Sequence, residues 1–321
     1  MFLNRLLSSR RYQRCVQLFR RPLWAHLQIS AALPAPLSLD INNGDRLDVS
    51  SARGCRRMFH LLLEQLPDPF PVRVADGLVE FQHEGRTYAL RPTYGDFYIF
   101  KEVIFRDDYR LNALPEPLGT VVDLGMNIGL FTTKMAAAAE RVIGLEPVQE
   151  NFEMANRALV RAGLDHKVTC LKAAIAGNSS GTVRIYSSDN NGGGHSMFRD
   201  HAAQWGNTRY EDVPVINLSD LFVQQGIERC SLVKCDIEGA EFELIANTPL
   251  EVLSSIDRIL MEVHLNVIDW DRQRFGDFTA RMTAAGFQVE HDSLVGRWGR
   301  RRRGIVLWAT NERAAATRRA A

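Results

Sequence analysis

Long apolar runs and paired cysteines are both missing from this 321-residue chain. No stretch approaches the roughly 18 consecutive apolar residues that a membrane-spanning helix needs. The five cysteines form no Cys-x-x-Cys pair, so neither a disulfide framework nor a zinc site is predicted, and we expect a reducing, cytoplasmic compartment. Hydrophobic residues make up 45% and charged residues 24%, which excludes a wholly disordered, collagen-like or polytopic membrane protein.

Acidic residues are absent before Asp40 and almost absent near the other end. Six arginines precede Asp40, and the segment from Arg297 contains eight arginines against the single acid Glu312. Because the net charge is only +1, the segment between these two ends must be acidic. Phosphate binding needs a basic surface on the domain itself, so this distribution argues against a nucleic-acid-binding domain.

The two basic ends allow more than one interpretation. Residues 1–29 mix arginine with Leu, Phe and Trp at loosely helical spacing, which is typical of a helix lying on an anionic membrane surface. A transit peptide or a solvated leader has a similar composition. Near the other end, the four arginines of residues 300–303 are expected in a turn between two strands. They would either contact a phosphate or an acidic sugar or be exposed to solvent.

The pattern of apolar residues divides the chain into three parts. An N-terminal extension, residues 1–94, contains the basic leader 1–39 and a small α+β region with a β-hairpin at 77–91. Over residues 95–311, short apolar strands alternate with helices. This alternation predicts a doubly wound, mostly parallel α/β sheet with an antiparallel hairpin at its edge. A basic tail, residues 312–321, follows.

The α/β part carries an insertion, residues 176–230, after its third strand. This insertion is rich in small and polar residues, which are Asn190, Asn191, Gly192, Gly193, Gly194, His195 and Ser196. Polar loops over strand ends often cover a substrate, so a lid is one interpretation and an ordinary surface loop is the other.

The first strand of the α/β part ends in a turn that suits a cationic ligand. It passes from Asp123 through Gly125, Asn127 and Gly129 into a helix. A dinucleotide-binding turn would have glycine where Asn127 stands, and Asp123 would repel a pyrophosphate. Asp123 suits instead the ammonium or sulfonium group of S-adenosylmethionine. The alternative is that the glycines serve only a tight turn and that Asp123 caps the helix.

The second strand ends at Glu146, which is followed by Pro147. An acidic side chain about 20 residues after the glycine turn can accept hydrogen bonds from both ribose hydroxyls of an adenosine. Adenine is then expected near the end of the third strand, at Ala173 and Ala174. These residues together favour S-adenosylmethionine over a nicotinamide dinucleotide, and the alternative is a solvent-exposed Glu146.

Two further strand ends carry candidates for catalysis. Asp236 ends the strand before a helix expected at residues 239–247, and His264 ends the next strand. Glu238 and Glu241 lie where the helix dipole stabilises carboxylates without any catalytic role. The spacing of cysteine and histidine demands no metal, although Asp236, Glu238 and His264 could together hold a magnesium ion.

At these residues the sequence resembles the FkbM-type methyltransferases, which are S-adenosylmethionine-dependent O-methyltransferases of the class I, Rossmann-like fold. The similarity extends over about residues 95–309, with Met126 where the family usually has alanine. The matching stretches are VVDLGMNIGLFT, VIGLEPVQENFEMANRAL, the segment 168–176, LVKCDIEGAEFELI and ILMEVH. The first 90 residues match nothing in the family core.

The resemblance implies a seven-stranded sheet and methylation of a hydroxyl on a sugar, glycolipid, polysaccharide or secondary metabolite. Hydroxyls are poor nucleophiles when protonated, so a general base is expected, with Asp236 and His264 as first candidates and Glu241 as a further one. Methylation of nucleic-acid bases is not expected, because CDIEGA stands in place of an Asn/Asp-Pro-Pro-aromatic motif. Two alternatives remain: an NAD-dependent oxidoreductase, which Asn127 and Asp123 disfavour, and a catalytically silent scaffold.

Overall fold

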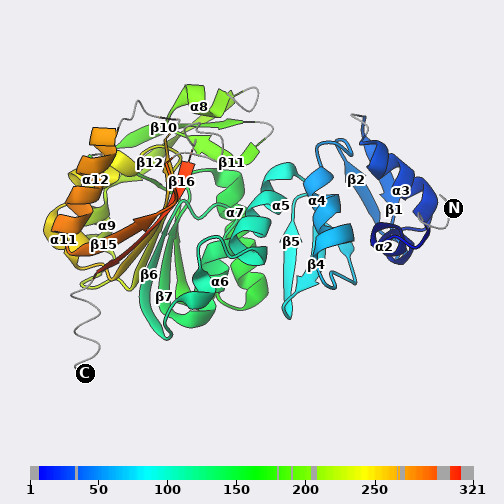
Figure 1. Ribbon diagram of the computed structural model, residues 1–321, viewed down its shortest axis with the longest axis horizontal. Coiled ribbons are helices and arrows are strands. Elements are labelled where there is room, and N and C mark those ends of the chain that lie inside the picture. The colour runs from blue at the N-terminus through cyan, green and yellow to red at the C-terminus, as the bar shows by residue number, and fades with distance from the viewer. Residues whose placement is uncertain are drawn as a thin grey trace. The chain divides into compact units, whose positions relative to one another are not determined.

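The computed structural model divides into two units, Met1–Arg106 and Asp107–Ala321, which we describe separately (Figure 1). The helix α5 (Tyr94–Phe100), at which we placed the domain boundary, belongs to the first unit. The structure describes residues 7–32, 35–178, 181–188, 191–203, 208–265, 267, 272–294 and 304–311. The Arg300–Arg303 turn, the tail 312–321 and Asn190 therefore lie outside the described residues.

The basic leader forms two helices and a strand rather than an extended segment. Ser9 caps α2 (Arg10–Leu18) through a hydrogen bond from Tyr12 N, and Pro22 begins α3 (Pro22–Ala31), where its missing N–H costs nothing. A hairpin follows, formed by β1 (Leu37–Asp40) and β2 (Arg46–Val49). Three arginines of the leader contact other residues of this unit. Arg10 and Arg14 donate hydrogen bonds to the backbone oxygen of Leu66, and Arg11 forms an ion pair with Glu64. A solvated leader therefore does not describe residues 10–31.

The rest of the first unit is a three-stranded sheet with helices. The predicted hairpin is β4 (Leu78–His83) and β5 (Arg86–Leu90), joined by Glu84 and Gly85, which both have positive φ as a tight hairpin turn requires. The strand β3 (Arg73–Ala75) pairs with β4. The helices are α4 (Arg56–His60), a π-helical turn Leu61–Gln65, and α5 with its π-helical continuation Lys101–Phe105. In the core between sheet and helix, Phe81 stacks against Phe97 and meets Phe100 edge to face.

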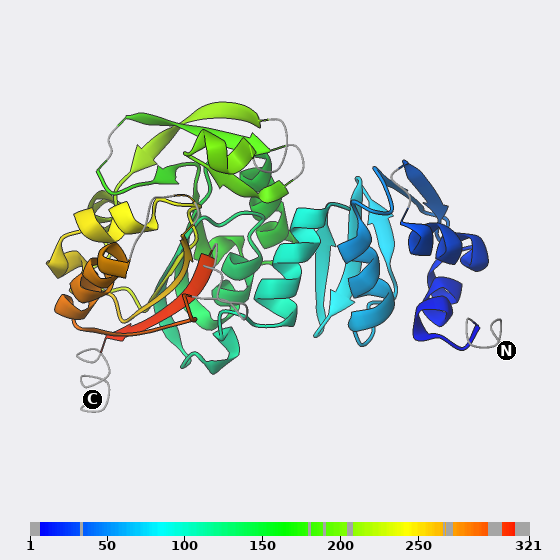
Figure 2. The same cartoon turned by 45° about the horizontal axis from the view of Figure 1, so that its top comes forward.

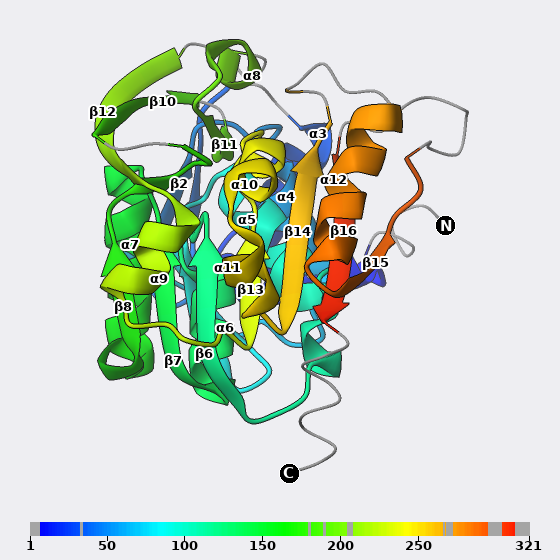
Figure 3. The ribbon, with the colours of Figure 1, turned by 90° about the vertical axis from the view of Figure 1, so that its left-hand side faces the viewer.

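The second unit contains a seven-stranded sheet, as the sequence predicts. Its order is β15-β16-β14-β13-β6-β7-β8, and only the contacts of β16 are antiparallel (Figure 3). The bounds are β6 (Leu118–Leu124), β7 (Ala139–Leu145), β8 (Val168–Leu171), β13 (Leu232–Cys235), β14 (Arg258–His264), β15 (Phe287–His291) and β16 (Gly304–Asn311). The last strand thus lies between β14 and β15.

Helices cover both faces of this sheet (Figure 3). One face carries α6 (Leu130–Ala138) and α7 (Gln149–Ala162), and the other α9 (Leu218–Gln224), α10 (Glu241–Asn247), α11 (Leu250–Ser254) and α12 (Arg272–Ala284). Phe242, Phe275 and Phe278 of the second layer pack on buried strand residues in one continuous core. This core joins the strands to the helices of the second layer.

The insertion folds into a second, four-stranded sheet with the order β11-β10-β12-β9. Its elements are β9 (Ala174–Ile175), β10 (Thr182–Ser188), β11 (Asn191–Ser196), α8 (Arg199–Ala203) and β12 (Thr208–Ile216). Figures 1 and 2 show this sheet in green beyond the carboxyl ends of the main strands.

Among the residues that the structure describes, no helix combines the length and the apolar composition that spanning a bilayer requires.

Candidate active site

The loop after β6 is shaped by close contact with the loop after β13. Gly125 has φ +79°, and a Cβ atom there would lie 2.0 Å from the backbone oxygen of Asp236. Gly129 has φ +78° and faces Ala155 of α7, so a Cβ atom would lie 2.9 Å from the Ala155 methyl. Asn127 also has positive φ, at +52°. The glycines therefore serve both the turn and the approach of two strand-end loops.

Glu146 is buried and bound to this loop, so it is not the solvent-exposed residue of the alternative interpretation. Its Oε2 accepts a hydrogen bond from Asn127 N at 2.8 Å, and its Oε1 accepts one from Val148 N at 2.9 Å. Burial raises the pKa of Glu146 to about 7, although both backbone donors act in the opposite direction. The carboxylate keeps further lone pairs that can accept ligand hydroxyls.

Pro147 and the two predicted adenine residues are neighbours of Glu146. Pro147 lies between Glu146 and Val148, inside the turn that their hydrogen bond closes. The backbone oxygen of Leu171, the last residue of β8, accepts bonds from Glu146 N and from Ala173 N, both at 3.1 Å. Ala174 begins β9 and is buried. The ends of β7 and β8 thus meet where we expect the adenosine.

Asp123 is fully buried beneath the loop, and its carboxylate binds protein groups. Thr132 Oγ1 donates a hydrogen bond to Oδ2 at 2.5 Å, and Lys234 Nζ lies 3.4 Å from Oδ1. Burial raises the pKa of Asp123, and Lys234 and Thr132 oppose this only in part. The structure therefore gives Asp123 a supporting position under the loop, and it gives no direct path from the carboxylate to solvent.

Lys234 connects the two strand-end loops, and sequence reasoning missed it. Its ammonium group donates a hydrogen bond to Gly125 O at 2.7 Å and lies 3.6 Å from Asp236 Oδ2. Burial alone would lower the pKa of Lys234, but Asp123 and Asp236 raise it above its usual value. A lysine inside the apolar strand LVKC was the available signal, because a buried charge needs a partner.

His264 lies among four carboxylates at the end of β14. Its Nδ1 is 2.9 Å from Glu241 Oε1, and its Nε2 is 3.2 Å from Glu238 Oε2. The same Nε2 lies 3.9 Å from both Asp236 Oδ1 and Glu262 Oε1. Burial lowers the pKa of His264, but Glu238, Glu241 and Glu262 outweigh it and raise the pKa well above 6.5. Both ring nitrogens of His264 are thus engaged by carboxylates, which leaves the partly exposed Asp236 as the stronger candidate base.

Glu241 orients His264 and the loop before α10. Besides His264 Nδ1, its Oε1 accepts hydrogen bonds from Gly239 N at 3.0 Å and Ile237 N at 3.3 Å. Burial alone would raise the pKa of Glu241, but His264 and the Gly239 N–H lower it below its usual value. Glu241 has no exposed surface, so the geometry makes it a positioning residue and places Asp236 and His264 nearer to a substrate.

The insertion contacts the site through Glu238, which has φ +51°. His201 Nε2 of α8 lies 2.7 Å from Glu238 Oε2, and Ser196 Oγ of β11 donates to Glu238 O at 2.6 Å. Gly239 follows with φ +112°, and a Cβ atom there would collide with Val267 and approach Phe198. The insertion, for which both a lid and an ordinary surface loop were expected as alternatives, thus contacts the site through Ser196 and His201.

Tyr109 and Glu262 also line the site and were not singled out from the sequence. The Tyr109 hydroxyl lies 3.3 Å from Glu262 Oε2 and 3.5 Å from Asp236 Oδ2. Strand periodicity offered a signal for one of them, because Glu262 and His264 are two residues apart and share a face of β14. For Tyr109 no local pattern existed, because its partners are more than 120 residues away in sequence.

The charged and polar side chains at the carboxyl ends of these strands fit the expected cofactor. Carboxylates outnumber the cationic groups Lys234 and His264, which favours a ligand with positive charge. Glu146 offers acceptor oxygens for ribose hydroxyls at the neighbouring strand end. S-adenosylmethionine carries both a sulfonium group and a ribose, so the residues present match its chemistry.

Sequence comparison identifies relatives over this same region. The methyltransferase FkbM domain family matches residues 123–289, which is more than half of the chain. "Methyltransferase 1" of Beauveria bassiana is 27% identical over 181 residues, which are 52% of this chain and 72% of that protein. "Methyltransferase sdnD" of Sordaria araneosa is 26% identical over 225 residues, which are 61% of this chain and 83% of that protein.

Structure comparison adds more distant similarities. The methyltransferase FkbM from Methylobacillus flagellatus aligns with a TM-score of 0.40 and 16% identity, over 62% of this chain and 46% of that chain. An S-adenosylmethionine-dependent methyltransferase from Agrobacterium tumefaciens aligns with a TM-score of 0.42 and 10% identity, over 75% of this chain and 72% of that chain. From the family match, the chain belongs to the FkbM methyltransferases and uses S-adenosylmethionine as its cofactor.

Proposed function

We propose that the protein methylates a hydroxyl oxygen of a sugar, a glycolipid or polysaccharide, or a secondary metabolite. The observation that carries this proposal is the position of the Asp236 carboxylate. It follows β13 directly, its side chain is 27% exposed, and its backbone touches Gly125 of the cofactor loop. A hydroxyl becomes a good nucleophile only as its proton is removed, and Asp236 is a carboxylate that a substrate can reach.

The residues of the chain have two tasks in such a reaction. When bound, S-adenosylmethionine supplies an activated methyl group, and its transfer leaves S-adenosylhomocysteine and one proton. The protein holds the acceptor oxygen in line with the methyl group. Asp236 accepts the hydroxyl proton, and Lys234 beside its Oδ2 keeps the carboxylate in place.

Two features support a hydroxyl-rich acceptor. Asp236, Glu238 and Glu262 present partly exposed carboxylates on one side of the edge, and carboxylates accept hydrogen bonds from hydroxyls. The acidic composition between the basic ends disfavours phosphate-rich acceptors such as nucleic acids. Neither relative's name states an acceptor, so the substrate class rests on this chemistry.

The type of bond formed can be tested directly. Purified protein is incubated with methyl-tritiated S-adenosylmethionine and acceptor pools of neutral glycans, glycolipids and small polyols. A methyl ether keeps its label through alkaline hydrolysis, a methyl ester releases volatile methanol, and a methylated amine binds to a cation exchanger. We expect alkali-stable, uncharged label; label in esters or amines would contradict O-methylation of a hydroxyl.

The scaffold alternative predicts a different outcome. A catalytically silent protein would still gain thermal stability with S-adenosylhomocysteine, because any ligand that binds the folded state stabilises it. It would transfer no label to any pool. Stabilisation by NAD in place of S-adenosylhomocysteine would contradict the assigned cofactor.

A further inference from the structure

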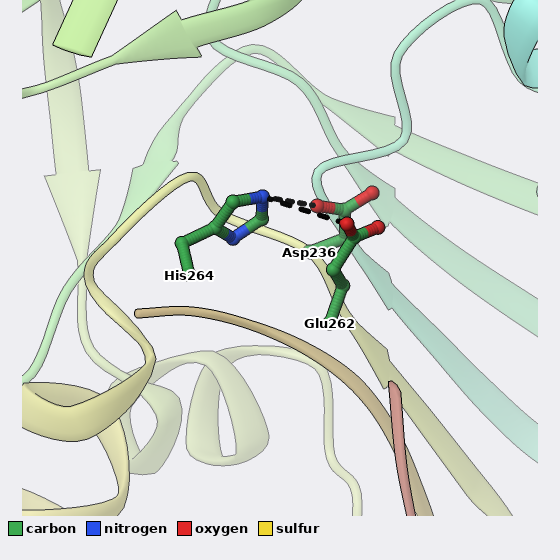
Figure 4. A group of neighbouring side chains, drawn as sticks. All are labelled: Asp236, Glu262 and His264. Carbon is green, nitrogen blue, oxygen red and sulfur yellow. Dashed lines mark ion pairs between the residues drawn. The ribbon is translucent and has the colours of Figure 1, made fainter. Parts of the chain in front are cut away.

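Three potential metal ligands converge at the carboxyl edge. They are Asp236, Glu262 and His264, and one ligand atom of each lies within 4.8 Å of the others. In Figure 4 the carboxylates of Asp236 and Glu262 both face the imidazole ring. His264 Nε2 is 3.9 Å from Asp236 Oδ1 and 3.9 Å from Glu262 Oε1. Glu262 and His264 belong to β14, and Asp236 directly follows the adjacent parallel strand β13.

These separations suit a bridging ion better than direct hydrogen bonds. A hydrogen bond between heavy atoms is about 2.7–3.2 Å long, so 3.9 Å is too long for one. Two oxygen or nitrogen ligands at about 2.1 Å from a small divalent cation lie about 3.0 Å apart at right angles and about 4.2 Å apart when opposite. The observed 3.9 Å lies within this range.

Other residues hold the remaining atoms of all three side chains. The Tyr109 hydroxyl contacts the outer oxygens, Asp236 Oδ2 and Glu262 Oε2, and thereby turns Oδ1 and Oε1 towards His264. Glu241, fully buried, binds His264 Nδ1 at 2.9 Å and leaves Nε2 facing the carboxylates. A buried carboxylate on the far ring nitrogen is the usual support of a metal-binding histidine.

We propose that Asp236, Glu262 and His264 bind one divalent cation, in the class of Mn²⁺ or Mg²⁺. Oxygen ligands favour these ions, and one imidazole is compatible with Mn²⁺. In a role that rests on the proposed function, the cation coordinates the acceptor hydroxyl and lowers its pKa. The hydroxyl proton then passes to Asp236 through Oδ2, the oxygen that does not face His264, as the acceptor oxygen takes the methyl group from the sulfonium.

Glu238 is excluded from the ligand set, although it also contacts His264. Its Oε2 lies 2.7 Å from His201 Nε2 and 3.2 Å from His264 Nε2, so this oxygen is already shared by two imidazoles. An ion bound at His264 Nε2 therefore displaces the proton by which this nitrogen contacts Glu238. We assign Glu262 in the place where the sequence had suggested Glu238.

The site is tested by binding of Mn²⁺ alone, without cofactor or acceptor. Protein freed of metal with a chelator is titrated with Mn²⁺, and the free ion is measured by electron paramagnetic resonance. We expect saturable binding of one ion per chain. Glu262→Gln should weaken it by about tenfold or more, and Tyr109→Phe, which keeps every ligand, should weaken it less but measurably.

The matched control is Glu290→Gln, the same chemical change at an exposed carboxylate of β15 that pairs with Arg110. It should leave Mn²⁺ binding unchanged, and circular dichroism establishes that each variant is folded. Absence of saturable binding, or equal binding by wild type and Glu262→Gln, would overturn the metal site. Alkali-stable hydroxyl methylation that survives the chelator would then leave the proposed function standing. Saturable Mn²⁺ binding without hydroxyl methylation would support the site and contradict the function.

Discussion

Gly125 and Asp236 lie so close that no side chain fits between them: a Cβ atom on Gly125 would lie 2.0 Å from the Asp236 backbone oxygen. This contact joins the loop after β6 to the loop after β13, which are more than 100 residues apart in sequence. Lys234 strengthens the junction by binding Gly125 O. The position of the proposed base, Asp236, is therefore tied directly to the position of the cofactor loop.

Gly125→Ala should disrupt this junction. The new methyl group meets backbone, which cannot move away as a flexible side chain can, and φ is +79°. We expect a loss of more than about 3 kcal/mol in the free energy of unfolding, measured by urea denaturation. Gly163→Ala is the control, because Gly163 has φ +66° with nothing within 4 Å, and it should cost only about 1–2 kcal/mol. Equal losses would show that the collision is unimportant.

The packing of the Met126 side chain should require glycine at position 144. A Cβ atom on Gly144 would lie 2.5 Å from Met126 Sδ, so the glycine in β7 makes room for a methionine where the family usually has alanine. Gly144→Ala should cost about 1–3 kcal/mol through overpacking. Combined with Met126→Ala it should cost less than the sum of the two single changes, by about 0.5–3 kcal/mol. Additive losses in this double-mutant cycle would contradict the packing relationship.

Binding of S-adenosylhomocysteine should depend on the ionisation of Glu146. Its pKa is raised to about 7, so folding favours the protonated form, and the stability contributed by this carboxyl is lost as pH rises through 7. The ionised carboxylate accepts ribose hydroxyls better. Affinity measured by calorimetry should therefore increase between pH 6 and pH 8. Glu146→Gln should bind more weakly and without this increase; a parallel pH profile in the variant would assign the effect to another group.

Asp236→Asn should lower kcat by about 10²–10⁴-fold with little effect on binding of S-adenosylhomocysteine. The amide keeps the size of the side chain but cannot accept the hydroxyl proton. Glu290→Gln serves as the control for loss of one carboxylate at an exposed position. Kinetics with an accepted substrate provide the measurement, and an Asp236→Asn enzyme with normal kcat would refute the assignment of the base.

The helix α3 should bind anionic membranes. Leu23, Trp24 and Leu27 are 45%, 58% and 50% exposed on one face, and exposed Arg20 and Arg21 precede them. Apolar insertion beside cationic groups attaches a helix to anionic lipid. Sedimentation with phosphatidylserine-containing vesicles at low salt should capture the protein, and Trp24→Ser should reduce capture.

Val223→Ser provides the control for this membrane prediction. Val223 is 81% exposed but belongs to α9 of the second unit, which lacks the basic leader, so its replacement should leave capture unchanged. Equal capture by neutral and anionic vesicles, or by Trp24→Ser and wild type, would contradict the prediction.

Local pattern in the sequence determined the architecture of the second unit. Apolar strands alternating with helices predicted the doubly wound sheet, and the carboxyl ends of parallel strands necessarily meet at one edge. The sequence alone therefore placed four side chains near one another, those of Asp123, Glu146, Asp236 and His264. The hairpin at 77–91 followed from turn residues that tolerate positive φ.

Only the tertiary structure decided which of these side chains touch and which reach solvent. Asp123 is buried under Lys234 and Thr132, and Glu241 is buried behind His264, although the sequence placed both simply at strand or helix ends. Tyr109 reaches the site from a segment with no recognisable motif. Contacts of this kind depend on strand register, side-chain packing and desolvation across distant segments, and local periodicity carries no information about them.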